Sequence, residues 1–240
     1  MSKVTKILIC IPCLTGAHHV KEAIESVINK TDVDVMVLDN GADEDVKKVI
    51  DGFEWNDSVF AWRQPINIYV NPAWNQFIKV FLANEKYSHM VLMNSDLIMQ
   101  KDFDIVLRNR WNVDENEVII PQMIQDKNAM QSDVDTNVSG AQKVYEGTAG
   151  VFITLNRKQA EIVHPLPTEC LVWFGDEFAF TILRALGYDT VIPENLLSYH
   201  YWSQTVQRVA GISEIIEQDK LAWEATGRAK MMEIINKHKI

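Results

Sequence analysis

The stretch Tyr87-Ser88-His89-Met90-Val91-Leu92-Met93-Asn94-Ser95-Asp96 contains an apolar run that ends abruptly in three polar residues. This pattern predicts a buried strand with a carboxylate at the edge of a sheet. In open α/β sheets, ligands bind beyond the carboxyl ends of the strands. Asp96 would therefore be placed to hold a divalent cation against a diphosphate. The alternative is that Asp96 closes a turn or caps a helix that begins near Asp102.

Strand and helix patterns alternate around this stretch. Apolar runs predict strands at 6–11, 34–38, 66–70 and 118–120. Apolar residues at helical spacing predict helices at 18–29, 43–50, 73–83 and 103–111, with Asn71 and Pro72 as the start of the third. Such alternation of helices with all-apolar strands predicts an α/β fold with a mostly parallel central sheet and helices on both faces.

The second half of the chain is less regular. The segment 122–147 is polar and has no clear period, which is typical of a functional or mobile loop. Strands are expected at 150–155 and 188–192, and helices at 159–163, 174–186 and 213–239. No linker composition interrupts the chain, so we expect one domain over 1–240 that ends in a C-terminal helical segment, 213–240.

Composition narrows the class of protein. The chain has 240 residues, with 23 Lys and Arg against 33 Asp and Glu, so its net charge is −10. Nucleic-acid binders usually show a basic excess, although a local basic groove can lie on an acidic protein. No apolar run reaches the roughly 18 residues of a membrane span, and no signal-peptide pattern is present. The three cysteines form no disulfide framework, so a cytoplasmic location is expected.

The pair Cys10-Ile11-Pro12-Cys13 has the spacing of a redox or zinc motif. A zinc site needs about four ligands, and the remaining cysteine, Cys170, stands far away in the sequence. Because Cys10 lies inside an apolar run, we expect it to be a buried small hydrophobic residue.

Several short motifs occur in a characteristic order. A strand ends near Pro12, a second ends in Asp39-Asn40-Gly41, and an Asn-rich segment, 71–75, precedes Asn94-Ser95-Asp96. A glycine-containing segment, 147–150, follows, then Asp176 eleven residues before Gly187-Tyr188, and finally His200 with Ser203 after it. From residue 7 to about 203, this order resembles the inverting, family 2-like nucleotide-sugar glycosyltransferases, which have the Rossmann-like GT-A fold.

The resemblance implies a nucleotide-sugar-binding half, 1–121, and an acceptor and catalytic half, 122–212. Donor binding is implied for Pro12, Thr15, Asp39, Asn71, Asn75, Asn94, Ser95 and Asp96. Asp96 and His200 would hold Mn²⁺ or Mg²⁺, and the imidazole makes Mn²⁺ suitable. Asp176, with Glu177 as the alternative, would be the general base for hexosyl or pentosyl transfer. The acceptor side would include Gly150, Trp173, Phe174 and Trp202, because aromatic faces stack on sugars and on bases.

The sequence departs from the family pattern at two positions. Asn94 replaces the first carboxylate of the Asp-x-Asp motif, which predicts weaker cation binding. Gly175 stands where the family has a Glu before the base. Structural alternatives also stay open: Asp176 as a helix cap, His200 as a residue of an aromatic core and Asp39 as a turn residue.

The donor and acceptor are not encoded by these motifs. We expect a UDP-sugar as donor, and either a saccharide or a hydroxymethylated base in DNA as acceptor, with a protein or small molecule as a further class. The second would suit a phage-type enzyme acting in the host cytoplasm, with Arg228, Lys230, Lys237 and Lys239 as phosphate contacts. A non-catalytic nucleotide- or sugar-binding module of the same fold is the competing hypothesis. The aromatic C-terminal half is also compatible with a homodimer interface.

Overall fold

A five-stranded sheet forms the centre of the computed structural model, which describes residues 5–146, 150–202, 209 and 211–239. The strand order is β3-β2-β1-β4-β9. The parallel strands are β1 (Ile7–Cys13), β2 (Val33–Asn40), β3 (Val59–Gln64) and β4 (His89–Met93), and β9 (Phe152–Asn156) runs antiparallel to β4. The prediction of a mostly parallel α/β sheet is therefore confirmed.

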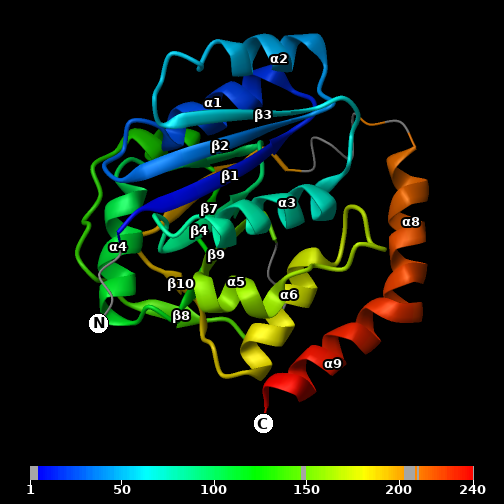
Figure 1. Cartoon of the computed structure of the whole chain (residues 1–240). Helices are drawn as coiled ribbons and strands as arrows, with labels where there is room; N and C mark the ends of the chain where they lie inside the picture. Colours follow the sequence, from blue (N-terminus) through cyan, green and yellow to red (C-terminus); the bar gives the residue numbers. More distant parts are fainter. Residues whose placement is uncertain (1–4, 147–149, 203–208, 210, 240) are drawn as a thin grey trace.

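Alternate residues of β1 pack into two separate cores, because successive side chains of a strand point to opposite faces. Ile7, Ile9 and Ile11 belong to one core. Helices α1 (Ala17–Val27), α2 (Glu44–Asp51) and α4 (Phe103–Val113) cover that face (Figure 1). Leu8 and Cys10 belong to the other core. Helices α3 (Val70–Ala83), α5 (Arg157–Val163) and α6 (Gly175–Ala185) cover it.

The cysteine pair in β1 has no redox or metal environment. Cys10 and Cys13 are both fully buried and free. Burial raises the pKa of each thiol, so neither forms the reactive thiolate. The expectation that Cys10 is a buried hydrophobic residue is confirmed.

Two three-stranded sheets extend the molecule beyond the central one. One has the order β6-β10-β8, from β6 (Val118–Ile119), β10 (Thr190–Pro193) and β8 (Ala141–Lys143). The other has the order β5-β11-β7, from β5 (Leu97–Met99), β11 (Leu197–His200) and β7 (Gln122–Ile124). The polar segment 122–147 thus supplies two short strands and a 3₁₀ turn, η1 (Lys127–Gln131), instead of a long irregular loop.

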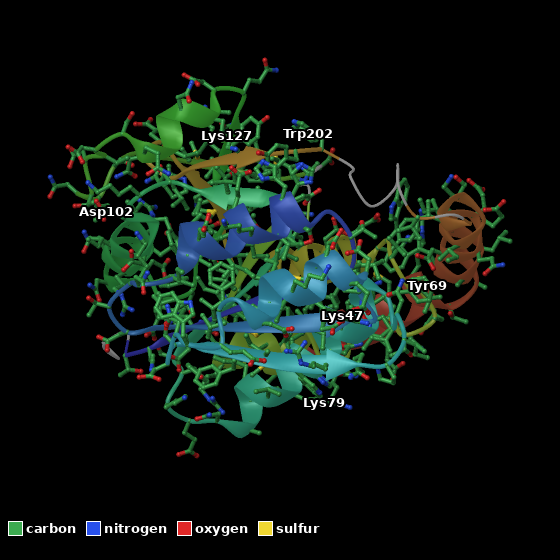
Figure 2. The ribbon with its side chains drawn as sticks, turned by 90° about the horizontal axis from the view of Figure 1, so that it is seen from above. Lys47, Tyr69, Lys79, Asp102, Lys127 and Trp202 are labelled. Carbon is green, nitrogen blue, oxygen red and sulfur yellow. The ribbon has the colours of Figure 1, made fainter. Side chains whose placement is uncertain are left out.

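The turn η1 is anchored to α1. Lys127 forms an ion pair with Glu22 and donates a hydrogen bond to the Tyr201 hydroxyl at 2.6 Å. Tyr201 also donates to Glu22 at 2.5 Å. Lys127 and Trp202 accordingly lie on the same side of the molecule, above α1 (Figure 2).

The C-terminal segment forms α8 (Ile212–Ala222), a π-helical turn η2 (Trp223–Gly227) and α9 (Arg228–His238). Helix α8 runs along the side toward which β1–β3 point, and α9 packs against α6 (Figure 1). Trp223 and Ile235 anchor the segment in the core shared by α3, α5 and α6. The expected C-terminal helical segment is confirmed. No helix of the described residues is long and apolar enough to cross a bilayer.

One predicted strand is wrong. The third strand is β3 (Val59–Gln64), and the apolar segment 66–70 forms an irregular turn followed by the start of α3. The Asn40 side chain accepts a hydrogen bond from the Ile68 N–H at 2.9 Å, so this backbone pairs with a side chain instead of a strand. A Cβ on Gly41 would lie 2.4 Å from the Ile66 carbonyl carbon, so Gly41 allows this close approach.

Candidate active site

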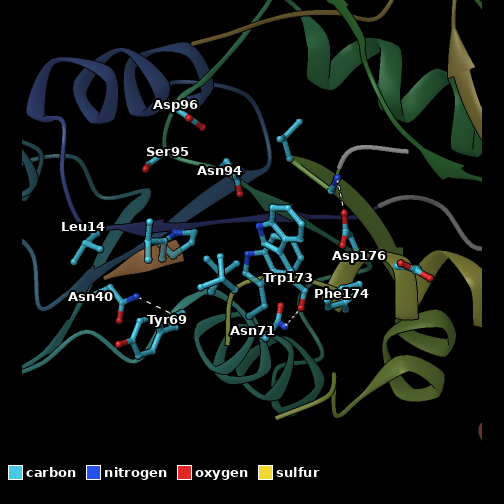
Figure 3. Close-up of a pocket in the computed structure, with 18 of the residues that line it drawn as sticks. Leu14, Asn40, Tyr69, Asn71, Asn94, Ser95, Asp96, Trp173, Phe174 and Asp176 are labelled. Carbon is cyan, nitrogen blue, oxygen red and sulfur yellow. Dashed lines mark hydrogen bonds between the residues drawn. The ribbon is translucent and has the colours of Figure 1, made fainter. Parts of the chain in front are cut away.

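A cavity of about 700 Å³ lies at the carboxyl ends of β1 and β4 (Figure 3). Eleven of the residues singled out in the sequence line it: Pro12, Asn71, Asn94, Ser95, Asp96, Gly150, Trp173, Phe174, Asp176, Glu177 and His200. They come from both halves of the chain, so the tertiary fold assembles one site from distant motifs.

Asp96 and His200 are brought together at one end of the cavity by the small sheet that contains β5 and β11. These strands are antiparallel, with His200 opposite Leu97, the residue after Asp96. His200 Nε2 lies 3.1 Å from Asp96 Oδ1, and the Tyr201 N–H donates to the Asp96 carbonyl at 3.0 Å. Both side chains are largely buried, with 13% of Asp96 and 6% of His200 exposed.

This pair fits a cation that is shared with a ligand. Within the described part of the chain, no group of three or more His, Cys, Asp or Glu residues is arranged to hold a metal ion. Mg²⁺ and Mn²⁺ in phosphate-binding sites are commonly held by one or two protein carboxylates, with phosphate oxygens and waters as the remaining ligands. Asp96 and His200 offer one carboxylate and one imidazole, and Asn94 and Ser95 line the same cavity with uncharged oxygen atoms.

Asp176 lies on another part of the cavity wall, in the first turn of α6. Its Oδ2 accepts a hydrogen bond from the Gly150 N–H at 2.9 Å. The side chain is half-buried, and burial raises the pKa of the carboxyl, while N–H groups of Gly150 and of the first turn of α6 oppose this shift. A Cβ on Gly150 would lie 2.1 Å from the Asp176 Cβ, so only glycine permits this approach.

Glu177 follows Asp176 on α6 and is exposed. Glu177, Thr181 and Arg184 recur at helical spacing, and all three line the cavity. Burial lowers the pKa of the Arg184 guanidinium, with the nearby charges of Glu177 and Glu146 opposing that shift. Arg184 is the sole Lys or Arg in the described lining, so carboxylates dominate this part of the wall.

The lack of space beside Asn71 explains why position 175 is a glycine. A Cβ there would lie 2.1 Å from Oδ1 of the buried Asn71. Asn71 in turn donates hydrogen bonds to the carbonyls of Cys170 at 2.9 Å and Trp173 at 2.8 Å. A Glu at position 175 therefore does not fit unless the contact with Asn71 is rearranged.

Four predicted site residues do not line the cavity. Asp39 is buried, accepts from the Ala42 N–H at 2.8 Å and lies 3.5 Å from the Arg63 guanidinium. Asn75 exchanges two hydrogen bonds with the Leu166 backbone, at 3.1 and 2.8 Å. Thr15 is half-buried, and Trp202 is 56% exposed, with its ring 4.8 Å from that of His200. Of the resemblance motifs, 147–149 and Ser203 lie outside the described residues.

Sequence reasoning missed several residues of the lining, among them Leu14, Asn40, Asn67, Tyr69, Trp74, Glu146 and Thr181, and it considered Arg184 only as a phosphate contact for DNA. Asn40 belongs to the quoted Asp-Asn-Gly motif, and its side chain donates to Asn67 Oδ1 at 3.0 Å and to the Tyr69 carbonyl at 3.3 Å. Because residues 66–70 were predicted to be a strand, Asn67 and Tyr69 were not expected to line a site. The i, i+4, i+7 spacing of Glu177, Thr181 and Arg184 was readable in the sequence.

Comparison with known proteins identifies the fold. No family model matches the sequence, and neither does any curated protein. Among solved structures, a similar one is the crystal structure of GalNAc-T7 with UDP, GalNAc and Mn²⁺, with a TM-score of 0.62 at 12% identity. The chain has a GT-A-like glycosyltransferase fold. The match covers 81% of this chain and 43% of the neighbour, so the chain corresponds to less than half of that protein.

Proposed function

We propose that the chain is an inverting glycosyltransferase that moves a sugar from a nucleoside-diphosphate donor to an acceptor hydroxyl. One observation carries this proposal. A single cavity of a GT-A-like fold contains both the Asp96–His200 pair and the half-buried Asp176 carboxylate. A transferase of this kind needs a cation site for the leaving diphosphate and a base for the acceptor hydroxyl.

The donor would bind with its diphosphate at Asp96 and His200. A bound Mn²⁺ or Mg²⁺ supplies Lewis-acid stabilisation of the departing diphosphate. The neighbouring wall of Pro12, Asn40, Asn67 and Tyr69 is the candidate nucleoside subsite, because it offers amides for hydrogen bonds and an aromatic ring. A UDP-sugar is the first donor to test, since the structural neighbour was crystallised with UDP.

Asp176 is the proposed general base. A carboxylate oxygen of Asp176 would accept the proton of the acceptor hydroxyl while the hydroxyl oxygen attacks the anomeric carbon. This single displacement would invert the configuration at the anomeric carbon. Asp176 is favoured over Glu177 because it is held by the Gly150 N–H and its pKa is raised toward the working pH. Glu177 is exposed and stays the alternative base.

A neutral saccharide is the proposed acceptor. Trp173 is 43% exposed and lines the cavity, where its face can stack on a sugar ring. Glu146, Asp176 and Glu177 place negative charge on the same wall. That charge opposes the approach of a DNA backbone, so the hydroxymethylated base is the second acceptor to test.

A donor screen tests the proposal. The protein is incubated with Mn²⁺ and UDP-, GDP- or dTDP-sugars, and released nucleoside diphosphate and thermal shift are recorded. We expect a metal-dependent shift and release with one donor, and loss of both in Asp96→Asn. Asp57→Asn is the matched control, because Asp57 is an exposed carboxylate remote from the lining.

Two outcomes would contradict the proposal. No shift with any donor removes the proposed donor site altogether. A metal-dependent shift without release, with every saccharide and DNA acceptor tried, supports the non-catalytic binding module instead.

A further inference from the structure

The Asp219 carboxylate is buried against the backbone of the loop that precedes the catalytic helix. Asp219 lies on α8 and is 1% exposed. Its oxygens accept hydrogen bonds from three consecutive backbone N–H groups, those of Leu171 at 2.7 Å, Val172 at 2.7 Å and Trp173 at 2.8 Å. No catalytic or binding role was expected for Asp219 from the sequence.

These contacts constrain the backbone strongly. A buried carboxylate is costly unless hydrogen-bond donors compensate its charge. Three successive N–H groups can converge on one carboxylate only in a narrow range of backbone conformations. Asp219 therefore stabilises one conformation of residues 171–174, which we call the 171–174 loop.

Asn71 holds the same loop through its carbonyl groups. Its amide group donates to the carbonyls of Cys170 and Trp173, and the Asn71 N–H donates to the Leu171 carbonyl at 3.0 Å. Asp219 thus binds N–H groups of the loop, and Asn71 binds carbonyl groups in and beside it. Hydrogen bonds from α8 and α3, two helices far apart in the sequence, therefore hold the loop in place.

The clamped loop leads directly into the proposed catalytic helix. Val172, Trp173 and Phe174 line the cavity, and Asp176 follows two residues later. Phe174 has a left-handed backbone, with φ of 66°, and its ring stacks on Trp223 of the π-helical turn at 5.1 Å and 7°. A displaced loop would therefore move an aromatic wall of the cavity and the start of α6 together.

We propose that Asp219 is a positioning residue that shapes the acceptor side of the cavity by fixing the 171–174 loop. The inference rests on the proposed transferase function, and it makes α8 part of the active-site architecture. Asp219 acts through Trp173 and Asp176 and is not proposed to touch the substrate.

The test compares Asp219→Asn with the wild-type chain by amide hydrogen exchange, donor binding and turnover. We expect exchange in a peptide covering 170–176 to rise about tenfold or more, because the hydrogen bonds to the loop weaken. The Kd for UDP with Mn²⁺ should change less than about twofold, because the proposed diphosphate and nucleoside walls contain no residue of the loop. Turnover should fall about tenfold to a hundredfold, since small displacements at a reacting centre cost that much.

A matched variant separates positioning from general destabilisation. Ile216→Ala removes a buried side chain from the same helix and leaves the Asp219 carboxylate in place, so it should lower the Tm while exchange at 170–176 and turnover per folded molecule stay near wild type. Unchanged exchange in Asp219→Asn would overturn the proposal. If Asp219→Asn shows raised exchange but keeps the same turnover as Ile216→Ala, the proposal is overturned as well. A wild-type chain that releases no nucleoside diphosphate from any donor refutes the transferase function instead, and the exchange measurement still decides whether Asp219 fixes the loop.

Discussion

At the residue scale, the environment of Asp176 connects burial, conformation and chemistry. The carboxylate is half-buried beside a glycine that leaves no room for a side chain, and it accepts a hydrogen bond from that glycine's N–H. Burial disfavours the charged form and raises the pKa, which brings the group closer to the basicity that proton abstraction near neutral pH requires. The same burial costs stability whenever the carboxylate is charged.

Asp176→Asn should therefore reduce activity and increase stability in the same protein. Loss of the base should lower turnover by about 10²- to 10⁴-fold. A raised carboxyl pKa means that the folded state holds its proton more tightly than the unfolded state, so its contribution to stability is present at low pH and is lost as pH rises through the folded pKa. The variant should consequently have the higher Tm at about pH 8, and the difference should narrow toward about pH 4.

Glu177→Gln is the control for this pair of measurements. Because Glu177 is exposed, the change should leave both Tm and turnover close to wild type. If turnover is lost in Glu177→Gln and retained in Asp176→Asn, Glu177 is the base and our assignment is wrong.

Gly150→Ala tests the close approach of the turn before β9 to α6. The added Cβ would lie 2.1 Å from the Asp176 Cβ, so one of the two segments must move. We expect turnover to fall about a hundredfold, because a shift of about 1 Å near the reacting atoms has that effect. UDP affinity, measured calorimetrically, should change little. Gly52→Ala, in a helix C-cap away from the cavity, should keep full turnover; equal turnover in both variants would contradict the prediction.

At the element scale, the buried side-chain amides of α3 hold the backbone that leads to the cavity. Asn71 and Asn75 lie one helical turn apart, and both bind the backbone of the segment between α5 and α6. Asn71 clamps the 171–174 loop, whereas Asn75 pairs with both backbone groups of Leu166. The Asn-rich start of α3, which resembles a donor-binding motif, thus also fixes the backbone of the segment between α5 and α6.

Asn75→Ala tests whether Asn75 stabilises the backbone at Leu166 or contacts the donor. The change leaves the N–H and C=O of the buried Leu166 unpaired, so the free energy of unfolding should fall by about 2–4 kcal/mol. Urea denaturation measures this loss. The affinity for UDP with Mn²⁺ should stay near wild type in the folded protein. Weaker UDP binding at unchanged stability would restore the donor role that the sequence resemblance implies.

At the scale of the whole molecule, electrostatics separate the acceptor classes. The chain carries a net charge of −10, and several of its carboxylates lie together on the cavity wall around Asp176. A neutral saccharide approaches such a site without electrostatic work, whereas a polyanion loses affinity unless basic groups release its counterions.

Salt dependence should reveal which acceptor class is used. We expect transfer to a saccharide to change less than about twofold between roughly 50 and 300 mM NaCl, because no long-range charge attraction assists binding. Steady-state rates at fixed donor concentration measure this. Efficient transfer to hydroxymethylated duplex DNA that weakens steeply with salt would contradict the saccharide assignment and indicate a basic DNA path on the surface.

Local patterns predicted much of the fold. The apolar run 6–11 specifies a strand buried on both faces, and the structure packs its alternate residues into two cores. The strand prediction for 66–70 was wrong, because apolar content alone does not distinguish a strand from a turn that a distant side chain stabilises. Here that side chain is Asn40. Propensity is local, and that contact spans 28 residues.

The sequence by itself determined the α/β class, the strand that leads to Asp96 and the helix that carries Asp176, because each depends on residues near one another in the chain. Only the tertiary structure decided that His200 meets Asp96, that Asn75 pairs with Leu166, and that Asp219 holds the 171–174 loop. Those contacts join segments dozens of residues apart. Their partners are chosen by sheet pairing and helix packing, which no local pattern records.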